Sequence, residues 1–396
     1  MCIFMLNFSF HCPTLFAFGD GEAQRTGVLV QRFGGTKVLL VYGGGSIFKN
    51  GAYDDAVASL NKAGIPFVEL GGVQPNPRSD KVYEGIDLCR SEGVDFILAV
   101  GGGSAIDTAK AIAVGVPYEG DFWDFFSHKQ ADKSMPVGVV LTLSATGSEA
   151  STSTVITHEN GDLKWGNLQT DVYRPAFAVM NPRYTCSLPP YQTACGAMDM
   201  LSHIMERYFT TTDHVDVTDR ISEGLMMSIL AAGPKALADP NDYHARADLM
   251  WAGMLAHNNL CGVGRVQDWA SHQIGMELSA FYDCAHGASL SVVFPAWMTY
   301  VMEQDPMRFA QFAVRVFGCQ MDFQHPENTA REGIQHLKDW IHVLGLPTKL
   351  QEVGGRTEDI PDMLAHRMKK PGGFPFGRFR PLQESAMAII LELTAR

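Results

Sequence analysis

The stretch that decides the fold is Phe96-Ile-Leu-Ala-Val-Gly-Gly-Gly-Ser-Ala-Ile-Asp-Thr-Ala-Lys-Ala-Ile-Ala113. Its first five residues are a short apolar run typical of a buried strand, and residues 105–113 have the apolar spacing of a helix. The glycines between them let the backbone approach a ligand closely, and the start of the helix presents unpaired N–H groups. A strand, a glycine loop and a helix in this order predict one βα unit of a parallel sheet with an anion-binding turn.

The same alternation of strand and helix extends from Thr36 to about Met180. The other expected strands are Lys37 to Tyr42, Pro66 to Leu70, Val137 to Leu141 and Ala176 to Met180. After Pro190 such runs are replaced by long segments with helical spacing. We therefore expect an α/β dinucleotide-binding domain over residues 1–185 and an all-α domain over residues 186–396, whose first helix starts at the Pro-rich turn Ser187 to Pro190.

Composition narrows the class of protein. The 396 residues carry a formal net charge of -12, with 46% hydrophobic and 19% charged residues. This balance predicts a folded, soluble chain, and the negative charge disfavours nucleic acid and anionic membranes as partners. The apolar runs are shorter than the roughly 20 residues of a membrane helix, and the N-terminus lacks the basic region of a secretory signal. We expect a cytoplasmic protein with a small-molecule substrate.

Two further expectations concern the cysteines and the N-terminus. The eight cysteines contain no C-x-x-C pair, which favours reduced thiols and excludes a cysteine zinc finger. The apolar N-terminal segment is interpreted as an edge strand over residues 5–18. Because an unpaired edge invites pairing with a second chain, we expect a homodimer.

Three loops are candidates for cofactor binding. Gly101 to Ser104 follows one expected strand, and Gly43-Gly-Gly-Ser46 follows another. A third loop offers hydroxyl groups. The candidate residues from these loops are Gly43, Gly44, Gly45, Ser46, Gly102, Gly103, Ser104, Thr142, Ser144 and Thr146. Taken alone, a GGGS turn is as often structural as ligand-binding. An NAD site usually has an acid at the end of the strand that meets the ribose, and Val41-Tyr42-Gly43 has none, so NADP(H) is favoured over NAD(H).

Histidines and carboxylates at helical spacing are candidate metal ligands. Asp199 and His203 stand four residues apart and share a helix face, and Asp268 and His272 repeat this spacing, with His286 14 residues further on. One carboxylate and three imidazoles suit Fe(II) or Zn(II). An Asp/His pair at this spacing is more often simply hydrogen-bonded, and spacing alone does not distinguish Asp199 from Asp268 as the ligand.

These features together resemble the iron-containing, or group III, alcohol dehydrogenases. The closest resemblance is to their butanol-dehydrogenase-like branch of NADPH-dependent aldehyde reductases. It extends over nearly the whole chain and rests on the glycine loops, Gln74-Pro-Asn76-Pro77, Asp107, residues 142–149, Asp199 with His203, and residues 267–287.

The resemblance implies a ligand set and further cofactor contacts. It assigns the metal to Asp199, His203, His272 and His286, and places Asp268 outside the ligand set. Asn76 and Asp107 join the candidate cofactor residues, and Lys164 is placed where it can reach a 2′-phosphate. The active site is expected between the two domains.

The implied reaction is hydride transfer between NAD(P)H and short- to medium-chain aldehydes or primary alcohols such as butanal and butanol. The metal polarises the substrate oxygen as a Lewis acid. The alternatives are a glycerol or other polyol dehydrogenase of the same fold, a dehydroquinate-synthase-like lyase, and a non-catalytic dinucleotide- or metal-binding protein.

Overall fold

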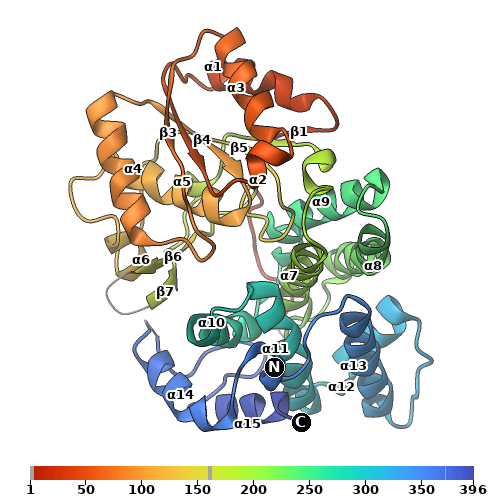
Figure 1. Cartoon of the computed structure of the whole chain (residues 1–396). Coiled ribbons are helices and arrows are strands. Elements are labelled where there is room, and N and C mark those ends of the chain that lie inside the picture. Colours follow the sequence, from red (N-terminus) through yellow and green to blue (C-terminus); the bar gives the residue numbers. More distant parts are fainter. Residues whose placement is uncertain (1–3, 159–162, 371) are drawn as a thin grey trace. The chain divides into compact units, whose positions relative to one another are not determined.

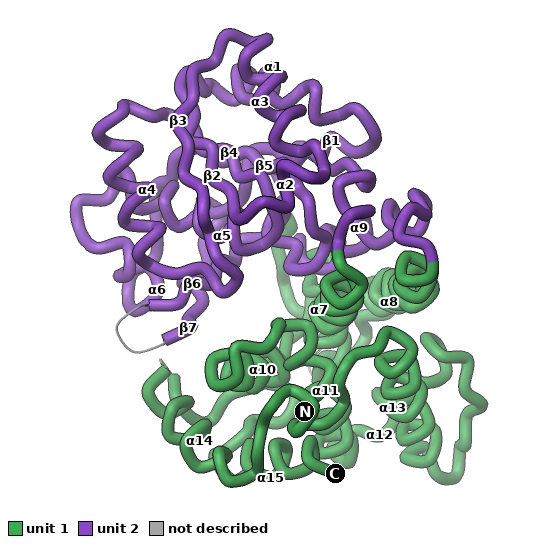
Figure 2. Tube along the Cα trace, in the orientation of Figure 1, with its two compact units in different colours: residues 1–10, 189–238, 259–396 green, residues 11–188, 239–258 purple. Residues whose placement is uncertain are grey.

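The computed structural model describes residues 4–158, 163–370 and 372–396 (Figure 1). It contains two compact units, coloured separately in Figure 2. The α/β unit consists of residues 11–188 and 239–258, and the helical unit consists of residues 4–10, 189–238 and 259–396. The main change of unit, after Leu188, lies close to the expected boundary at 185. Two segments differ from the expected division: residues 4–10 belong to the helical unit, and residues 239–258 belong to the α/β unit.

The α/β unit contains a six-stranded sheet in which every pairing is parallel. The strand order is β1-β8-β5-β4-β2-β3. The strands are β1 (Leu15–Phe18), β2 (Val38–Tyr42), β3 (Phe67–Leu70), β4 (Phe96–Gly101), β5 (Val137–Leu141) and β8 (Phe177–Met180). The five strands expected from the sequence are thus confirmed within one residue at either end.

Helices cover both faces of this sheet. Successive side chains of a strand point to opposite faces, so each strand can contribute to two cores. In β4, Ile97 and Ala99 pack in one core with helices α4 and α5, whereas Leu98 and Val100 pack in a second core with α1 and α3. The helices of the unit are α1 (Thr26–Arg32), α2 (Ser46–Lys49), α3 (Ala52–Lys62), α4 (Ser79–Glu92), α5 (Gly103–Gly115), α6 (Asp124–Ser127) and α9 (Tyr243–His257).

Helix α9 explains why residues 239–258 belong to this unit. Its Met250 and Met254 are buried in the same core as α4 and α5, and Trp251 contacts the rings of Phe16 and Phe18 edge-on. Helical spacing identifies such a segment as a helix but does not indicate which of two cores it completes.

The helical unit contains the remaining helices. They are α7 (Pro190–Tyr208), α8 (Asp216–Ala238), α10 (Ala270–Tyr282), α11 (His286–Val301), α12 (Pro306–Phe312), α13 (Pro326–Val343), α14 (Ile360–Met368) and α15 (Glu384–Thr394). Helix α7 starts at the expected Pro-rich turn, with proline in its first turn. The expected all-α second half is confirmed. None of the described helices combines the length and the apolar character needed to cross a membrane.

Two elements differ from expectation. Only Leu15–Phe18 of the expected strand over residues 5–18 is a strand, and it does lie at the edge of the sheet. Pro13 has no N–H to donate to a ladder, and the Leu6 N–H donates to the Gly264 carbonyl of the helical unit. The extended prediction is therefore wrong for residues 5–14, and residues 1–3 lie outside the described chain. The sequence also did not indicate a small antiparallel hairpin, β6 (Val155–His158) and β7 (Leu163–Gly166).

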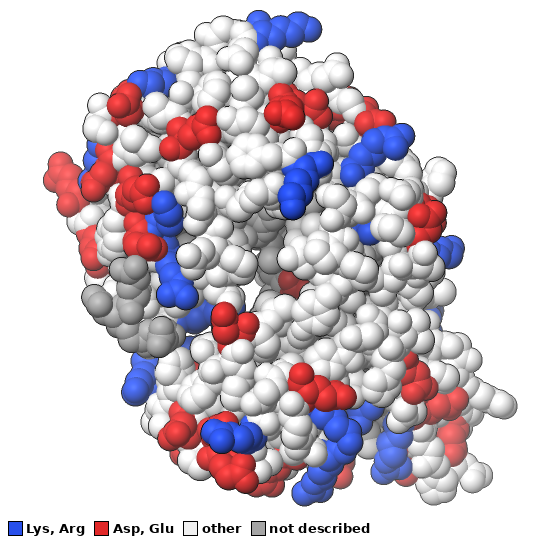
Figure 3. All heavy atoms as spheres, in the orientation of Figure 1, with Lys and Arg blue, Asp and Glu red and all other residues white. Residues whose placement is uncertain are grey.

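Surface charge and cysteines agree with the composition. On the face shown in Figure 3, acidic and basic side chains of the described residues are interspersed and form no continuous basic patch. No disulfide joins the seven cysteines that the structure describes.

Candidate metal centre and cofactor loops

Helix α7 carries the first two residues of a histidine and carboxylate cluster in the helical unit. Asp199 and His203 lie one turn apart, and His203 Nε2 is 3.7 Å from Asp199 Oδ1. Both side chains are almost fully buried. The expected shared helix face is therefore present, and it is directed into the unit.

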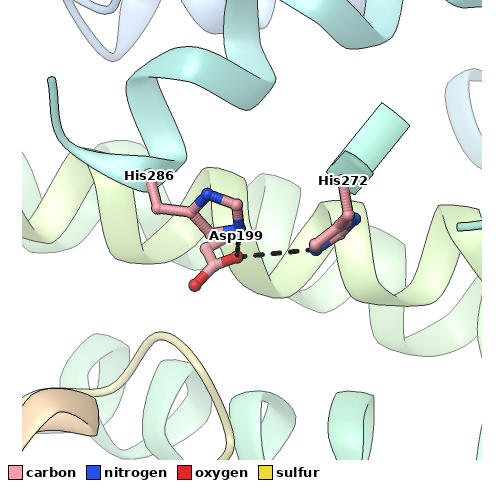
Figure 4. A group of neighbouring side chains, drawn as sticks. All are labelled: Asp199, His272 and His286. Atoms are coloured by element: carbon pink, nitrogen blue, oxygen red, sulfur yellow. Dashed lines mark ion pairs between the residues drawn. The ribbon is translucent and has the colours of Figure 1, made fainter. Parts of the chain in front are cut away.

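Two further histidines approach the same carboxylate oxygen from other helices. His272, on α10, and His286, the first residue of α11, each place Nε2 3.9 Å from Asp199 Oδ1 (Figure 4). The ligand atoms of Asp199, His272 and His286 lie within 4.8 Å of one another. His286 is the most exposed of the four side chains, at 26%. The structure thus brings together all four residues that the resemblance assigned to the metal.

Glu206 holds the third member of the cluster in place. Its Oε1 accepts both the backbone N–H of His272 and the His272 ring nitrogen Nδ1, each at 2.8 Å. Burial raises the pKa of Glu206 to about 8, although the backbone N–H groups of His272, Trp269 and Ser271 and the charge of Arg207 oppose the shift. Glu206 was not among the residues predicted for the site, although it lies seven residues after Asp199 on α7 and the 199, 203, 206 periodicity indicates it.

The His272 ring shows that the cluster fits a cation. When Glu206 is ionised, Nδ1 donates to its carboxylate and Nε2 carries the lone pair. Nε2 is buried and has no hydrogen-bond partner among the described residues. Burial, together with the nearby Arg207 charge, lowers the pKa of His272 to about 3. A neutral imidazole with a buried lone pair, held by a carboxylate on its other nitrogen, is the usual arrangement of a metal-binding histidine.

Aromatic and basic side chains close one side of the cluster. Trp269 contacts the His272 ring at 5.1 Å between centroids and the His203 ring at 6.1 Å. The Arg207 guanidinium lies 4.5 Å from the Trp269 ring centroid, and it donates to the His203 carbonyl. This packing fixes the ring positions and excludes water from one side of the group.

Asp268 does not join the cluster, although its spacing to His272 equals that of Asp199 to His203. Helix α10 begins at Ala270, and Trp269 has a left-handed backbone with φ 67°, so Asp268 precedes the helix. Its carboxylate accepts the N–H groups of Ala270, Arg378 and Phe379. Asp268 therefore links the backbone at Arg378 and Phe379 to the start of α10 through hydrogen bonds.

The carboxyl end of the parallel sheet brings the expected cofactor loops to one edge. Gly101 pairs with Leu141, and Tyr42 pairs with Val100, so the loops that follow β2, β4 and β5 start at the same level. A side chain at Gly103 would place its Cβ 2.6 Å from the Thr146 hydroxyl, so only glycine allows this approach. Residues of two expected loops, Gly102 to Ser104 and Thr142 to Thr146, therefore lie side by side.

The hydroxyl groups of the third loop differ in their surroundings. Thr142 is buried, and its N–H donates to the Gly101 carbonyl. Thr146 accepts the Ser148 N–H. The buried Ser144 hydroxyl has no hydrogen-bond partner in the described chain. Ser144 is thus the hydroxyl of this loop best suited to receive a ligand.

Asp107 is fully buried and bonded within the chain. Its two carboxylate oxygens accept the Ser148 hydroxyl at 2.6 Å and the Val155 N–H at 3.0 Å. Lys110, one turn later on α5, donates to Ser148 and to the carbonyls of Ser151 and Ser153. Both residues tie α5 to the loop after β5, and Asp107 is enclosed by its own chain.

The loop after β2 lies open at its tip. Gly44 and Gly45 are exposed, and nothing lies within 4 Å of a Cβ built on either. Ser46 begins the short helix α2. The neighbouring strand β3 carries Glu69, which the sequence analysis did not consider. Its two carboxylate oxygens accept the hydroxyls of Tyr42 and Tyr53.

Lys164 and Asn76 come together although 88 residues separate them. Lys164 lies on β7, and its Nζ donates to Asn76 Oδ1 at 2.8 Å. Asn76 has φ 54°, and the next residue, Pro77, accepts the Thr157 N–H of the same hairpin. The hairpin that the sequence did not indicate is therefore the element that holds Lys164.

Family models match both parts of the chain. The model described as iron-containing alcohol dehydrogenase matches residues 13–182. The model for the C-terminal part of the Fe-containing alcohol dehydrogenase family matches residues 193–394.

Individual proteins match over nearly the full length. The chain is 40% identical to NADH-dependent butanol dehydrogenase A of Clostridium acetobutylicum, covering 96% of this chain and 97% of that protein. It is 36% identical to the NADPH-dependent aldehyde reductase YqhD of Escherichia coli, covering 91% and 92%. The crystal structure of NADH-dependent butanol dehydrogenase A from Thermotoga maritima superposes with a TM-score of 0.95 at 40% identity, covering 100% of both chains.

Proposed function

Because the chain belongs to the iron-containing alcohol dehydrogenase family, we propose that it interconverts short- to medium-chain aldehydes, such as butanal, and their primary alcohols with NADP(H). The proposed metal ligands are Asp199, His203, His272 and His286, with Fe(II) or Zn(II) as the ion. The observation that carries this proposal is the convergence of three imidazole nitrogens within 3.9 Å of one buried carboxylate oxygen.

The chain's own residues have distinct tasks in this reaction. When bound, the metal ion supplies a Lewis acid for the substrate oxygen, and the nicotinamide supplies or accepts the hydride. Glu206 keeps His272 in the tautomer whose Nε2 lone pair faces Asp199. Trp269 closes the cluster against water, and the partly exposed His286 lies where a substrate can enter.

Replacement of one ligand tests the metal proposal. We expect His272→Ala to lose the metal of this cluster and butanal reduction together, because Asp199 then faces fewer imidazoles. The matched control is His366→Gln, since His366 also hydrogen-bonds a buried glutamate, Glu277, but lies outside the cluster. Turnover that survives in His272→Ala, or falls equally in His366→Gln, would contradict the ligand assignment.

The proposed preference for NADP(H) rests on charge at the carboxyl edge of the sheet. The loop after β2 has no acid, and the nearby Glu69 already accepts two tyrosine hydroxyls. Lys164, with Asn76, offers a cation for a 2′-phosphate. The relatives differ in their named cofactor, since the Clostridium enzyme is NADH-dependent and the Escherichia enzyme is NADPH-dependent.

Kinetics with both cofactors test this preference. Loss of a hydrogen bond to a charged group costs about 2 kcal/mol, so Lys164→Gln should raise KM for NADPH by roughly 30-fold and leave KM for NADH nearly unchanged. Lys37→Gln is the control, because Lys37 precedes β2 at the opposite edge of the sheet. Equal KM values for NADPH and NADH in the unmodified enzyme would overturn the preference.

A homodimer is the proposed assembly. The described N-terminal residues are apolar and exposed, including Phe4 at 66% and Phe8 at 53%, and β1 is an edge strand. Such a surface favours association. Sedimentation equilibrium should give twice the chain mass, and a monomeric mass at micromolar concentration would contradict the assignment.

A further inference from the structure

A second group of metal-binding side chains lies in the helical unit. It consists of Cys319, Glu332 and His336, whose ligand atoms lie within 4.8 Å of one another. None of these residues belongs to the cluster of Asp199, His203, His272 and His286. They also supply a sulfur atom, which the Asp199 cluster does not contain.

Backbone geometry brings the three residues together. Helix α12 runs into a π-helical turn, Ala313–Phe317, which ends at Gly318 with φ 75°, and the Cys319 N–H donates to the Ala313 carbonyl. Gly333 lets α13 pack tightly on this turn, because a Cβ there would lie 2.5 Å from the Ala313 Cβ. Cys319 is thereby held against the turn of α13 that carries Glu332 and His336.

The two residues on α13 supply two of the three donor atoms. Glu332 and His336 stand four apart on the same helix face, with His336 Nε2 3.7 Å from Glu332 Oε1. The His336 ring stacks on Phe317 at 5.6 Å and 23°. About half of each side chain is exposed, so an ion and a water ligand can reach them from solvent.

Cys319, which follows the π-helical turn, supplies the third donor. Its side chain is 7% exposed, and its thiol interacts with the Glu332 carboxylate. Burial and this carboxylate raise the pKa of the thiol, so the metal-free group keeps its proton. A cation that binds here replaces that proton, which passes to solvent as the sulfur becomes a thiolate ligand.

We propose that Cys319, Glu332 and His336 form a second metal site that takes Zn(II) or a similar borderline-soft ion. A thiolate, an imidazole and a carboxylate are the ligands that Zn(II) accepts, whereas Mg(II) and Ca(II) require oxygen ligands. Three protein ligands leave one tetrahedral position for water. The full chain then binds two metal ions, and total metal content overstates occupancy of the Asp199 cluster.

Titration of the full-length, metal-stripped protein with Co(II) tests the proposal. A cobalt-bound thiolate gives a near-ultraviolet charge-transfer band, and the three histidines and carboxylate around Asp199 give none. The band should saturate at one thiolate-bound Co(II) per chain and disappear on addition of Zn(II). In Cys319→Ser we expect no such band at any Co(II) concentration. In His336→Gln, Co(II) affinity should fall by at least about tenfold. Loss of a group that only orients a metal ligand already weakens binding by about that factor, and loss of the ligand itself should cost at least as much.

Two variants serve as controls in the same titration. Cys195→Ser removes a buried cysteine one turn before Asp199, and His325→Gln removes an exposed histidine 3.5 Å from Glu327 with no thiol in its pair. Both should retain the band. A wild-type spectrum without a thiolate band at saturating Co(II), or a band that persists in Cys319→Ser, would overturn the second site. Neither result depends on turnover or on the proposed function.

Discussion

Glu206 is the residue whose role follows most directly from its contacts. It accepts the first-turn N–H of His272 and the ring nitrogen of the same residue, so one carboxylate both caps α10 and orients a proposed metal ligand. Partners of this kind raise the basicity of a ligating histidine and fix its tautomer. Glu206 is therefore a positioning residue and does not itself touch the ion.

Glu206→Gln should weaken metal binding about 10- to 100-fold, because the amide keeps the shape but cannot ionise to the carboxylate that favours the donating tautomer. The KM for NADPH should stay nearly unchanged, since the cofactor loops belong to the other unit. Competitive titration of stripped protein that also carries Cys319→Ser, with a zinc indicator, measures the affinity of this cluster. Glu277→Gln is the matched control, as Glu277 is a buried glutamate that hydrogen-bonds His366. The prediction fails if both variants bind metal like the parent.

At this scale, part of the site could be read from the sequence. The spacing of Asp199 and His203 predicted their shared face, and the family resemblance selected Asp199 over Asp268. The physical reason for that choice was not available from the sequence. It depends on the left-handed turn at Trp269 and on N–H groups of Arg378 and Phe379, which lie about 110 residues further along the chain.

At the scale of elements, Lys110 joins α5 to the loop after β5. Lys110→Met removes three hydrogen bonds and leaves Asp107 buried without a nearby cation, so we expect the free energy of unfolding to fall by about 3 kcal/mol. The loop also carries Ser144, so KM for NADPH should rise. Urea unfolding and cofactor titration measure the two effects. Lys338→Met, at a half-buried position of α13 in the other unit, should change neither. Unaltered stability in Lys110→Met would refute this account.

Helices α8 and α12 are joined by a buried ion pair. Asp219 on α8 receives two hydrogen bonds from Arg308 on α12, and Arg265 adds a contact at 2.8 Å. Burial alone would raise the pKa of Asp219, but the two arginines more than offset it and hold the pKa below 3.8. Because the folded pKa is depressed, the stabilisation is present above pH 3.8 and is lost as the pH falls through the lower folded value.

Asp219→Asn should therefore lower the free energy of unfolding by about 3 kcal/mol at pH 7. This difference should vanish in acid, where Asp219 of the parent protein is itself protonated and uncharged. Thermal unfolding from pH 7 down to pH 3 should show the two proteins converging at low pH. Asp171→Asn, which changes an exposed carboxylate beside Arg174, should follow the parent throughout. A stability difference that is constant across this range would show that the charge of Asp219 is not its cause.

Element prediction was successful where the apolar pattern was strong. Strand β4 and helix α5 were expected from one continuous stretch, and the structure has them within two residues. The β6 and β7 hairpin was not indicated, because each strand has only four residues and neither is a continuous apolar run. That hairpin places Lys164 beside Asn76, so a proposed cofactor contact depends on an element that the sequence alone did not define.

For the whole molecule, the family comparisons and the contacts answer different questions. The family models match both parts of the chain and identify it as a member of the iron-containing alcohol dehydrogenases. The contacts explain how its own residues can bind a cation, through the lone pair of His272 and the carboxylate of Asp199. Cofactor preference is a local property, since the relatives at 40% and 36% identity are named as NADH-dependent and NADPH-dependent, respectively.

Two metal sites also affect how the whole protein must be measured. If Cys319 holds Zn(II), chelation empties two sites, and only one concerns turnover. Measurements on Cys319→Ser avoid this ambiguity, because the Asp199 cluster contains no cysteine.

The most direct test of the central claim is butanal reduction by Cys319→Ser protein before chelation, after chelation, and after return of one equivalent of Fe(II) or Zn(II). NADPH binding is followed in parallel by fluorescence. We predict that the stripped protein still binds NADPH, loses turnover at least about 100-fold, and recovers it with one equivalent of metal. Undiminished turnover in protein shown to be metal-free would contradict the account.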